Sequence, residues 1–247
     1  FKHGDRVAYA GLPPGAYAQI RLIPDHRLLK IPDSIPSKTA AAMMLKGMTA
    51  RYLIKGCYAV KPGDTILVHA AAGGVGSIVS QWASDIGATV IGTVGSREKA
   101  ELAEANGCRY PILYNQDDFA EKVREITNGE GVAAVYDAVG QATFMKSLDC
   151  LKTFGMMVSF GQASGSVPPV DPAILAAKGS LFLTRPSLMT YTEKREDLLA
   201  HAKDLFDAVE RKAVQIKIGQ EYPLSDAAVA HRHLEGRKTT GSTILIP

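Results

Sequence analysis

Hydrophobic positions in the middle of the chain follow an alternation of short apolar runs and longer amphipathic segments. The apolar runs, which predict strands, cover residues 66–70, 89–94, 110–113, 133–137, 155–160 and 181–185. Segments with helical spacing lie between most of them, at residues 75–86, 98–105, 119–127 and 143–151, and residues 171–177 precede the last strand. Apolar strands joined by crossover helices are typical of a doubly wound parallel sheet in an α/β protein.

The first 36 residues have a different pattern. Short β-like runs at residues 6–9 and 16–23 are separated by glycine and proline, which fits a small antiparallel or barrel-like region. Residues 38–57 then favour a helix, with a break expected at Gly47. The sequence therefore predicts a small β region and a helix ahead of the alternating series.

The regular alternation stops after Pro186. A long charged helix is expected over residues 193–212. Shorter elements follow at residues 221–224, 226–234 and 242–246. We expect these last pieces to rejoin the β region of residues 1–36, so that one part of the protein is discontinuous in sequence.

A glycine-rich turn joins the first strand of the series to its helix. Here an apolar run leads straight into Ala71-x-Gly73-x-x-Gly76, within TILVHAAAGGVG. Such glycines let the backbone approach a pyrophosphate at a helix N-terminus, where free N–H groups and the helix dipole favour anions. Alanine replaces the first glycine of GxGxxG, but the strand–turn–helix context is the one that the motif requires. The alternative is a tight turn without a ligand. The turn predicts dinucleotide binding by Gly73, Gly74, Val75 and Gly76.

The tip of the second strand indicates which dinucleotide binds. Sites that prefer NAD usually carry an acidic residue about 20 residues past the turn, which binds the ribose 2′-hydroxyl. Here the strand runs into Gly95 and Ser96 and then into the basic Arg97 and Lys99, while Glu98 falls at the start of the next helix. A small, basic tip has room and charge for a 2′-phosphate, so the sequence favours NADPH over NADH. The alternative is a solvated first helical turn.

Composition disfavours several other classes of protein. The chain has 247 residues, 46% of them hydrophobic and 21% charged, which is typical of one large or two smaller globular domains. A net charge of +3 is too small to indicate a nucleic-acid surface, and no apolar run reaches the roughly 18 residues of a membrane span. Cys57, Cys108 and Cys150 lie far apart, so we expect reduced thiols and a cytoplasmic setting.

Five segments carry a family resemblance: LVHAAAGGVG, VYDAVG, LKTFGMMVSFG, KGSLFLTRPS and GRKTTGSTILIP. They closely resemble the zinc-independent, zeta-crystallin-like quinone oxidoreductases of the medium-chain dehydrogenase/reductase superfamily. The resemblance implies an NADPH-binding Rossmann domain over residues 47–186 and a GroES-like, β-rich catalytic domain split between residues 1–46 and 187–247. It also implies that an N-terminal segment is missing, because the chain opens at Phe1 within a strand pattern.

The resemblance implies roles for individual residues around the cofactor. The 2′-phosphate of NADPH would be held by Lys99, Tyr114 and Arg237, which offer an ammonium, a hydroxyl and a guanidinium to a dianion. The alternatives are a core position for Tyr114 and surface positions for the two cations. The expected cofactor-binding set is Thr49, Gly73, Gly74, Val75, Gly76, Ser96, Lys99, Tyr114, Phe160, Gly161 and Arg237.

The nicotinamide end of the site would draw on separate segments of the chain. By the resemblance, Thr49 would lie near the nicotinamide amide, and Phe160 and Gly161 would line the nicotinamide pocket at the carboxyl edge of the sheet. Ala138 stands where relatives often have serine, which removes one hydroxyl contact. Tyr17 is a further candidate for the pocket wall. The alternative for each side chain is an ordinary core or helix position.

The sequence lacks a pattern of zinc ligands. Zinc-dependent relatives place a cysteine at the equivalent of Lys46 and carry a four-cysteine lobe, and neither feature is present. The six histidines have no spacing with cysteine or glutamate that indicates catalytic zinc. We therefore expect hydride transfer from NADPH to a quinone without a metal, with the protein supplying proximity, a dry cleft and orientation. No side chain is identified as a general acid, so the catalytic residues stay open.

Two alternatives to quinone reduction come from the same resemblance. Reduction of an alkenal or enone needs the same cofactor geometry and differs only in the substrate pocket. A non-enzymatic alternative is an NADPH-binding crystallin-like or RNA-binding protein. The low net charge and the lack of a basic stripe with aromatic residues disfavour RNA.

The expected partners are a small-molecule quinone or enone and a second copy of the chain, with no membrane and no nucleic acid. Relatives dimerise by extending the sheet through its last strand, which corresponds to residues 179–185. The apolar run Leu181-Phe182-Leu183 would form an edge strand open to pairing. The alternative is that a loop covers this strand.

Overall fold

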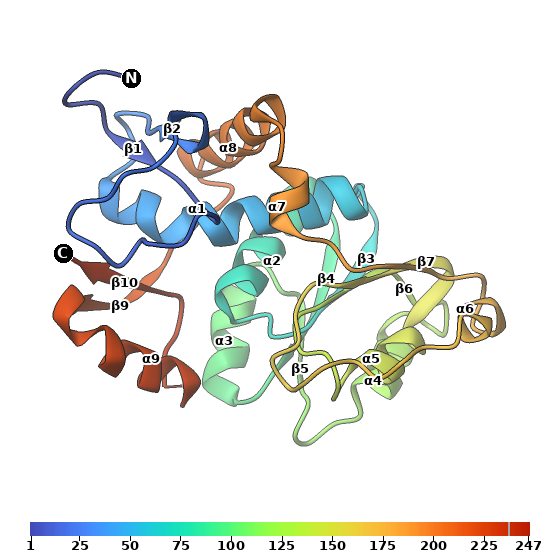
Figure 1. Cartoon of the computed structure of the whole chain (residues 1–247). Helices are drawn as coiled ribbons and strands as arrows, with labels where there is room; N and C mark the ends of the chain where they lie inside the picture. The colour runs from blue at the N-terminus through green and yellow to red at the C-terminus, as the bar shows by residue number, and fades with distance from the viewer. Residues whose placement is uncertain (237) are drawn as a thin grey trace. The chain divides into compact units, whose positions relative to one another are not determined.

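The computed structural model describes residues 1–236 and 238–247, and the chain divides into two compact units (Figure 1). Unit 1 combines Phe1–Tyr52 with Leu188–Pro247, and unit 2 is Leu53–Ser187. Along the chain, unit 1 first gives way to unit 2 between Tyr52 and Leu53, at the end of helix α1 (Ser37–Tyr52) and not within it. The division into functional domains at residues 47 and 187 stays a prediction.

Unit 2 is built around a six-stranded parallel sheet with the strand order β5-β4-β3-β6-β7-β8. The strands are β3 (Thr65–Val68), β4 (Thr89–Val94), β5 (Tyr110–Leu113), β6 (Val132–Asp137), β7 (Leu151–Ser159) and β8 (Phe182–Thr184). The helices of this unit are α2 (Gly74–Ile86), α3 (Arg97–Ala105), α4 (Phe119–Ile126), α5 (Phe144–Leu148) and α6 (Ala173–Ala177), after the π-helical turn η2 (Leu53–Cys57). The predicted doubly wound α/β sheet is confirmed.

Burial of the central strands explains their continuous apolar sequences. Every residue of β6 is buried, and so are Ile66, Leu67 and Val68 of β3. The helices contribute large side chains such as Phe119 and Phe144 to the same core. Parallel sheets are covered on both faces, so the side chains on both faces of their central strands are buried and mostly apolar.

The helix predicted over residues 143–151 is too long. Helix α5 ends at Leu148, and β7 already begins at Leu151. The N–H group of Val132 donates to the carbonyl of Cys150 at 2.8 Å, and Leu151 pairs with Val132 in the sheet. Burial of Cys150 and Leu151 in extended backbone therefore outweighs the local helical pattern, which is a weak determinant of structure.

The break expected at Gly47 does not occur, because α1 runs without interruption to Tyr52. A Cβ atom at position 47 would lie 2.5 Å from Cδ1 of Leu205 on α8 (Arg195–Glu210). Glycine is therefore needed where the two helices of unit 1 pack closely. This packing offsets the roughly 1 kcal/mol that glycine costs in a helix interior.

The β structure of unit 1 consists of two separate pairs of strands. They are β1 (Val7–Ala8) with β2 (Leu29–Lys30), antiparallel, and β9 (Ile218–Pro223) with β10 (Ser242–Ile246), parallel. The final elements thus join the unit of residues 1–36 but pair with each other. The strand predicted at residues 16–23 is wrong: it pairs with no described strand, and Ile20 and Leu22 are 90% and 97% exposed. A strand without a neighbour is not stable in water.

The other elements of unit 1 are helical. They are η1 (Asp25–Arg27), α7 (Leu188–Tyr191), η3 (Leu224–Asp226) and α9 (Ala227–Glu235). Among the helices of the described residues, none combines the length and the hydropathy needed to cross a membrane.

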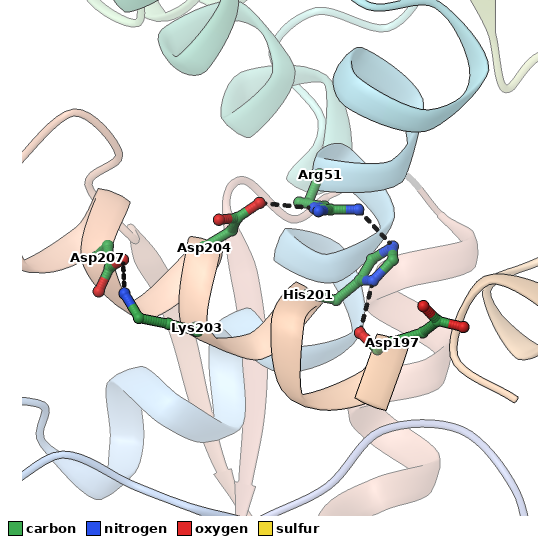
Figure 2. Close-up of polar contacts among 6 residues, drawn as sticks. All are labelled: Arg51, Asp197, His201, Lys203, Asp204 and Asp207. Atoms are coloured by element: carbon green, nitrogen blue, oxygen red, sulfur yellow. Dashed lines mark hydrogen bonds and ion pairs between the residues drawn. The ribbon is translucent and has the colours of Figure 1, made fainter. Parts of the chain in front are cut away.

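A polar cluster joins the end of α1 to α8 within unit 1 (Figure 2). Arg51 donates from Nε to Oδ2 of Asp204 at 2.9 Å and from Nη1 to Nε2 of His201 at 3.1 Å. Nδ1 of His201 donates to the carbonyl of Asp197 at 2.8 Å. This pattern requires a neutral imidazole. Burial, together with the nearby Arg51 guanidinium, lowers the pKa of His201 below its ordinary value.

Candidate functional site

The predicted cofactor residues of unit 2 follow the strands of the sheet at their carboxyl ends. The glycine turn follows β3, Ser96 and Lys99 follow β4, Tyr114 follows β5, and Phe160 with Gly161 follows β7. Since all six strands are parallel, these ends meet at one edge of the sheet. The chain order reverses between β3 and β6, and ligands of doubly wound sheets bind outside such a switch point. Thr49 belongs to unit 1, and Arg237 lies outside the described residues.

The turn after β3 is shaped by two glycines that approach the carbonyl of Ala70. Gly73 stands at the N-cap of α2, and its N–H group donates to Ala70 O at 2.8 Å. A Cβ atom on Gly73 would lie 3.0 Å from that oxygen, and one on Gly76 would overlap it outright. No side chain caps the helix, so its first N–H groups stay available to an anion. This backbone cradle fits the pyrophosphate of a dinucleotide.

Alanine is tolerated at position 71, in place of the first glycine of the motif, because Gly92 of β4 leaves space for its methyl group. Ala71 is fully buried, and its N–H group donates to the carbonyl of Thr93 at 3.1 Å. A Cβ atom on Gly92 would lie 2.5 Å from Cβ of Ala71 and 2.7 Å from Sγ of Cys108. Glycine at position 92 on the neighbouring strand therefore provides the space that the Ala71 side chain needs. The sequence of the turn alone does not reveal this compensation.

The tip of β4 and the end of β5 lie against each other. A Cβ atom on Gly95 would lie 2.6 Å from the hydroxyl oxygen of Tyr114, so the phenol rests on the glycine. The side chain of Ser96 caps α3 by accepting from the N–H group of Lys99 at 3.3 Å. Tyr114 is 51% exposed, and Lys99 is partly exposed. The structure thus brings Ser96, Lys99 and Tyr114 together at one partly exposed tip.

Asp137 organises the loops that follow β6 and β7. Its Oδ1 accepts from the N–H groups of Val139 and Gly140 at 2.7 and 3.0 Å, and its carbonyl accepts from those of Phe160 and Gly161 at 2.8 and 3.2 Å. The side chain is fully buried. Sequence reasoning missed this residue, although an aspartate at the end of a buried strand is a known turn-forming signal.

Arg185 fixes the same edge from the end of β8. Its Nη1 donates to the carbonyl of Ser159 at 2.8 Å and to that of Gly161 at 3.2 Å. A Cβ atom on Gly161 would lie 2.5 Å from the carbonyl oxygen of Ala138, so the loops after β6 and β7 are packed backbone to backbone. Arg185 belongs to the KGSLFLTRPS segment of the family resemblance. Its contacts with the carbonyls of Ser159 and Gly161 could not be predicted from the spacing of residues along the chain.

His69 is buried beneath the glycine turn and holds three elements together. Ser147 of α5 donates its hydroxyl hydrogen to the carbonyl of Thr143 at 2.8 Å. Its oxygen therefore accepts from Nε2–H of His69 at 2.8 Å, and Nδ1 of His69 accepts from the hydroxyl of Thr93 at 2.9 Å. Complete burial lowers the pKa of His69 and keeps the ring neutral. His69 is 1% exposed, so its two hydrogen bonds satisfy a buried ring.

Thr49 occupies a buried position near the end of α1. Its side chain is 8% exposed, and its hydroxyl donates to the carbonyl of Leu45 at 2.8 Å. The oxygen of this hydroxyl can still accept a hydrogen bond, for example from an amide. Its role toward the nicotinamide stays a prediction.

Comparison with known proteins gives the chain its family. The family model described as zinc-binding dehydrogenase matches residues 74–204. A quinone oxidoreductase from Pseudomonas aeruginosa is 48% identical over 247 residues, which are 100% of this chain and 76% of that protein. The chain belongs to the quinone oxidoreductase family.

Two further relatives bear on the function of this quinone oxidoreductase family member. A 2-haloacrylate reductase from a Burkholderia species is 47% identical over 250 residues, covering 100% of this chain and 75% of that protein. The crystal structure of Escherichia coli quinone oxidoreductase complexed with NADPH is similar with a TM-score of 0.97 and 45% identity, covering 100% of this chain and 76% of that one. The predicted fold and family are confirmed.

Four of the six histidines of this family member have hydrogen-bond partners within the protein: His69, His201, His231 and His233. His69 and His201 are buried as described above, while His231 and His233 share hydrogen bonds of 2.8 and 2.7 Å with the hydroxyls of Tyr17 and Tyr222. Within residues 1–236 and 238–247, no group of three or more His, Cys, Asp or Glu side chains is placed to hold a metal ion. Tyr17, proposed as a pocket wall, thus has a partner in His231.

Acidification is expected to weaken the fold of this family member through His69 and His201. Both histidines have a lowered pKa, so below pH 6.5 the unfolded chain binds protons that the folded chain does not. Stability is therefore fully present above pH 6.5 and is lost as the pH falls toward the folded values. Urea unfolding at about pH 8 and at about pH 5.5 measures the difference. His201→Gln should reduce this slope.

Proposed function

We propose that the chain binds NADPH and reduces quinones by hydride transfer, without a metal ion. The observation that carries this proposal is the glycine cradle at the start of α2, at the switch point of the sheet. The family gives further support, since relatives are quinone oxidoreductases and one was solved in complex with NADPH. The zinc-free part of the proposal rests on the family resemblance, by which Lys46 stands where zinc-dependent relatives would have a cysteine.

We assign to the predicted residues the roles that the family resemblance implies. Gly74, Val75 and Gly76 would hold the pyrophosphate through backbone N–H groups, and Gly73, whose own N–H group donates to Ala70, would let the pyrophosphate approach the backbone closely. Ser96, Lys99 and Tyr114 would surround the 2′-phosphate, joined by Arg237. Thr49, Phe160 and Gly161 would position the nicotinamide.

When bound, NADPH supplies the hydride, and the chain supplies position and environment. Asp137 and Arg185 keep the loops at the nicotinamide end rigid through their backbone hydrogen bonds. Rigid supports of this kind hold reacting groups in one geometry, which accounts for much of the rate gain in such reactions. A quinone needs little further activation, because its reduced oxygens are stabilised aromatic oxyanions.

Two measurements on the 247-residue chain test the proposal. NADPH fluorescence during titration with protein should report binding, and NADPH absorbance should fall only after a quinone is added. 2-Haloacrylate, offered in place of the quinone, should be reduced more slowly. Binding without loss of NADPH for any quinone would favour the non-enzymatic alternative, and faster reduction of haloacrylate or an enone would favour the alkenal/enone alternative.

We also propose that two copies associate through β8. This strand pairs only with β7 among the described strands, and Phe182 and Leu183 are 55% and 39% exposed. An open edge with apolar side chains is a template for pairing with a second chain. Leu183→Asp should convert a dimer to a monomer in light scattering after gel filtration, while Leu199→Asp on the exposed face of α8 should not. A monomeric wild type would refute this assignment.

A cytoplasmic location is proposed from the cysteines. Cys108 and Cys150 are buried thiols whose pKa is raised to about 12, mainly by burial, so neither is a reactive nucleophile. Such inert, unpaired thiols suit a reducing compartment.

A further inference from the structure

Gly95 follows β4 directly, and its backbone conformation does not require glycine. Its φ lies outside the left-handed region, so an alanine could adopt the same conformation. A Cβ atom at this position would instead meet the phenol of Tyr114, with the hydroxyl oxygen at 2.6 Å, Cζ at 3.1 Å and Cε1 at 3.4 Å. These atoms belong to the far end of one flexible side chain. Glycine at position 95 therefore preserves the place of a phenol and not the shape of a turn.

The backbone at the end of β5 is fastened to the tip of β4. Leu113 pairs with Val94 in the sheet, and the N–H group of Tyr114 donates to the carbonyl of Val94 at 3.2 Å. The next residue, Asn115, donates from Nδ2 to the carbonyl of Gly95 at 3.4 Å. Because these contacts fix the backbone on both sides, a side chain at position 95 would have to displace the phenol.

The Tyr114 phenol is not a core side chain. It belongs to a residue that is 51% exposed, and its hydroxyl has no hydrogen-bond partner among the described residues. A tyrosine hydroxyl can donate one hydrogen bond and accept another. Packing gives little reason for a glycine that makes room for an exposed hydroxyl, because such a group gains little from burial. A ligand at this tip would give such a reason.

We propose that Gly95 determines which coenzyme the chain accepts, because it lets the Tyr114 hydroxyl reach the 2′-phosphate, and that Asn115 positions Gly95. This assignment rests on the proposed function, in which Tyr114 binds that phosphate. Sites that prefer NAD carry Asp or Glu about 20 residues past the glycine turn, in the region of the chain where Gly95 stands. Glycine there removes a carboxylate that would repel a phosphate dianion and admits a hydroxyl that binds it.

A double-mutant cycle between positions 95 and 114 tests this role. In fluorescence titrations of the 247-residue chain, Gly95→Ala should lower the ratio of NADPH to NADH affinity about tenfold, as the loss of one hydrogen bond does. Tyr114→Phe should lower the ratio equally, and the double variant should lower it no further, since both changes remove the same hydroxyl. Tyr110→Phe is the matched control, because it removes a hydroxyl from the other end of β5, and should leave the ratio unchanged.

A carboxylate at position 95 should reverse the preference. In Gly95→Asp the side chain would displace the phenol, repel the 2′-phosphate and accept hydrogen bonds from the ribose hydroxyls of NADH. NADPH affinity should therefore fall while NADH affinity rises, a gain that mere damage to the fold cannot produce. Asn115→Ala should lower the ratio by less than Gly95→Ala, because it loosens the tip without entering it. Thermal unfolding checks that each variant is folded.

The outcomes separate this role from the proposed function. Additive losses in Gly95→Ala and Tyr114→Phe would overturn the role of Gly95, and so would an unchanged ratio in Gly95→Ala or an equal loss for both coenzymes. In each case a wild type that binds NADPH leaves the proposed function standing. A wild type that binds no NADPH would overturn both. If Gly95→Ala does not fold, Asn115→Ala decides, since an unchanged ratio in that variant would overturn the arrangement at the tip.

Discussion

Alanine at position 76 is expected to lower the stability of unit 2, while alanine at position 73 is expected to weaken NADPH binding with little change in stability. A Cβ atom on Gly76 would overlap the carbonyl oxygen of Ala70 and lie 3.0 Å from Cα of Ala71, both backbone atoms that cannot move without displacing the turn. Overpacking of this kind costs about 1–3 kcal/mol. Gly76→Ala should therefore lower the melting temperature and weaken NADPH binding together.

Gly73 differs from Gly76 in what surrounds it. It is exposed, and its Cβ atom would lie 3.0 Å from Ala70 O, a contact that a small shift relieves. The added methyl group would instead occupy the face that a pyrophosphate must approach. Gly73→Ala should weaken NADPH binding about tenfold or more, equivalent to one lost charged hydrogen bond, with little change in melting temperature.

The pair of glycine variants separates packing from binding. Thermal unfolding monitored by circular dichroism gives the stability, and fluorescence titration with NADPH gives the affinity. Ser77→Ala, one residue further into α2, removes a hydroxyl without entering the turn and is the matched control. If Gly73→Ala binds NADPH as the wild type does, the cradle does not hold the pyrophosphate.

The sequence was sufficient for the sheet because each strand carries its own signal. A strand such as Val132–Asp137 is buried along its whole length, so its apolar run can be recognised without knowing its neighbours. The order of the strands was not predicted, because right-handed crossovers narrow the possible topologies but do not select one.

Errors arose where a distant residue decides the local structure. Gly47 stays helical because Leu205 needs the space of its missing side chain, and Leu205 is far away in sequence. Residues 16–23 have a strand-like composition but no neighbouring strand among those described. In both cases the tertiary environment overrides local propensity.

The candidate site shows the same division between local and distant information. The glycine turn and the basic tip could be found from short motifs, because backbone approach and phosphate charge demand particular residues at fixed spacing. The roles of Gly92 and Arg185 depend on neighbours across the sheet: Ala71 for the first, and the carbonyls of Ser159 and Gly161 for the second. No pattern along the chain reports such contacts.

Removal of the Lys99 ammonium is expected to convert an NADPH-preferring site into one that distinguishes the two coenzymes poorly. Ser96 fixes the first turn of α3 by capping it at the Lys99 N–H group, and Tyr114 lies against Gly95 at the same tip. A 2′-phosphate there would receive charged hydrogen bonds that a ribose hydroxyl cannot match. Lys99→Ala should therefore weaken NADPH by about 1.5–3 kcal/mol and leave NADH nearly unchanged.

The ratio of NADPH to NADH affinity separates this specific effect from a general change in charge. Arg97→Ala is the matched control, because it removes the same charge from the same helical turn but from a more exposed side chain. It should lower the ratio much less than Lys99→Ala, since exposed charges are screened by water and salt. Tyr114→Phe should lower the ratio by an intermediate amount, as it removes a neutral donor. Equal losses for both coenzymes in Lys99→Ala would mean that the 2′-phosphate is bound elsewhere, and a larger effect of Arg97→Ala would transfer the role to that residue.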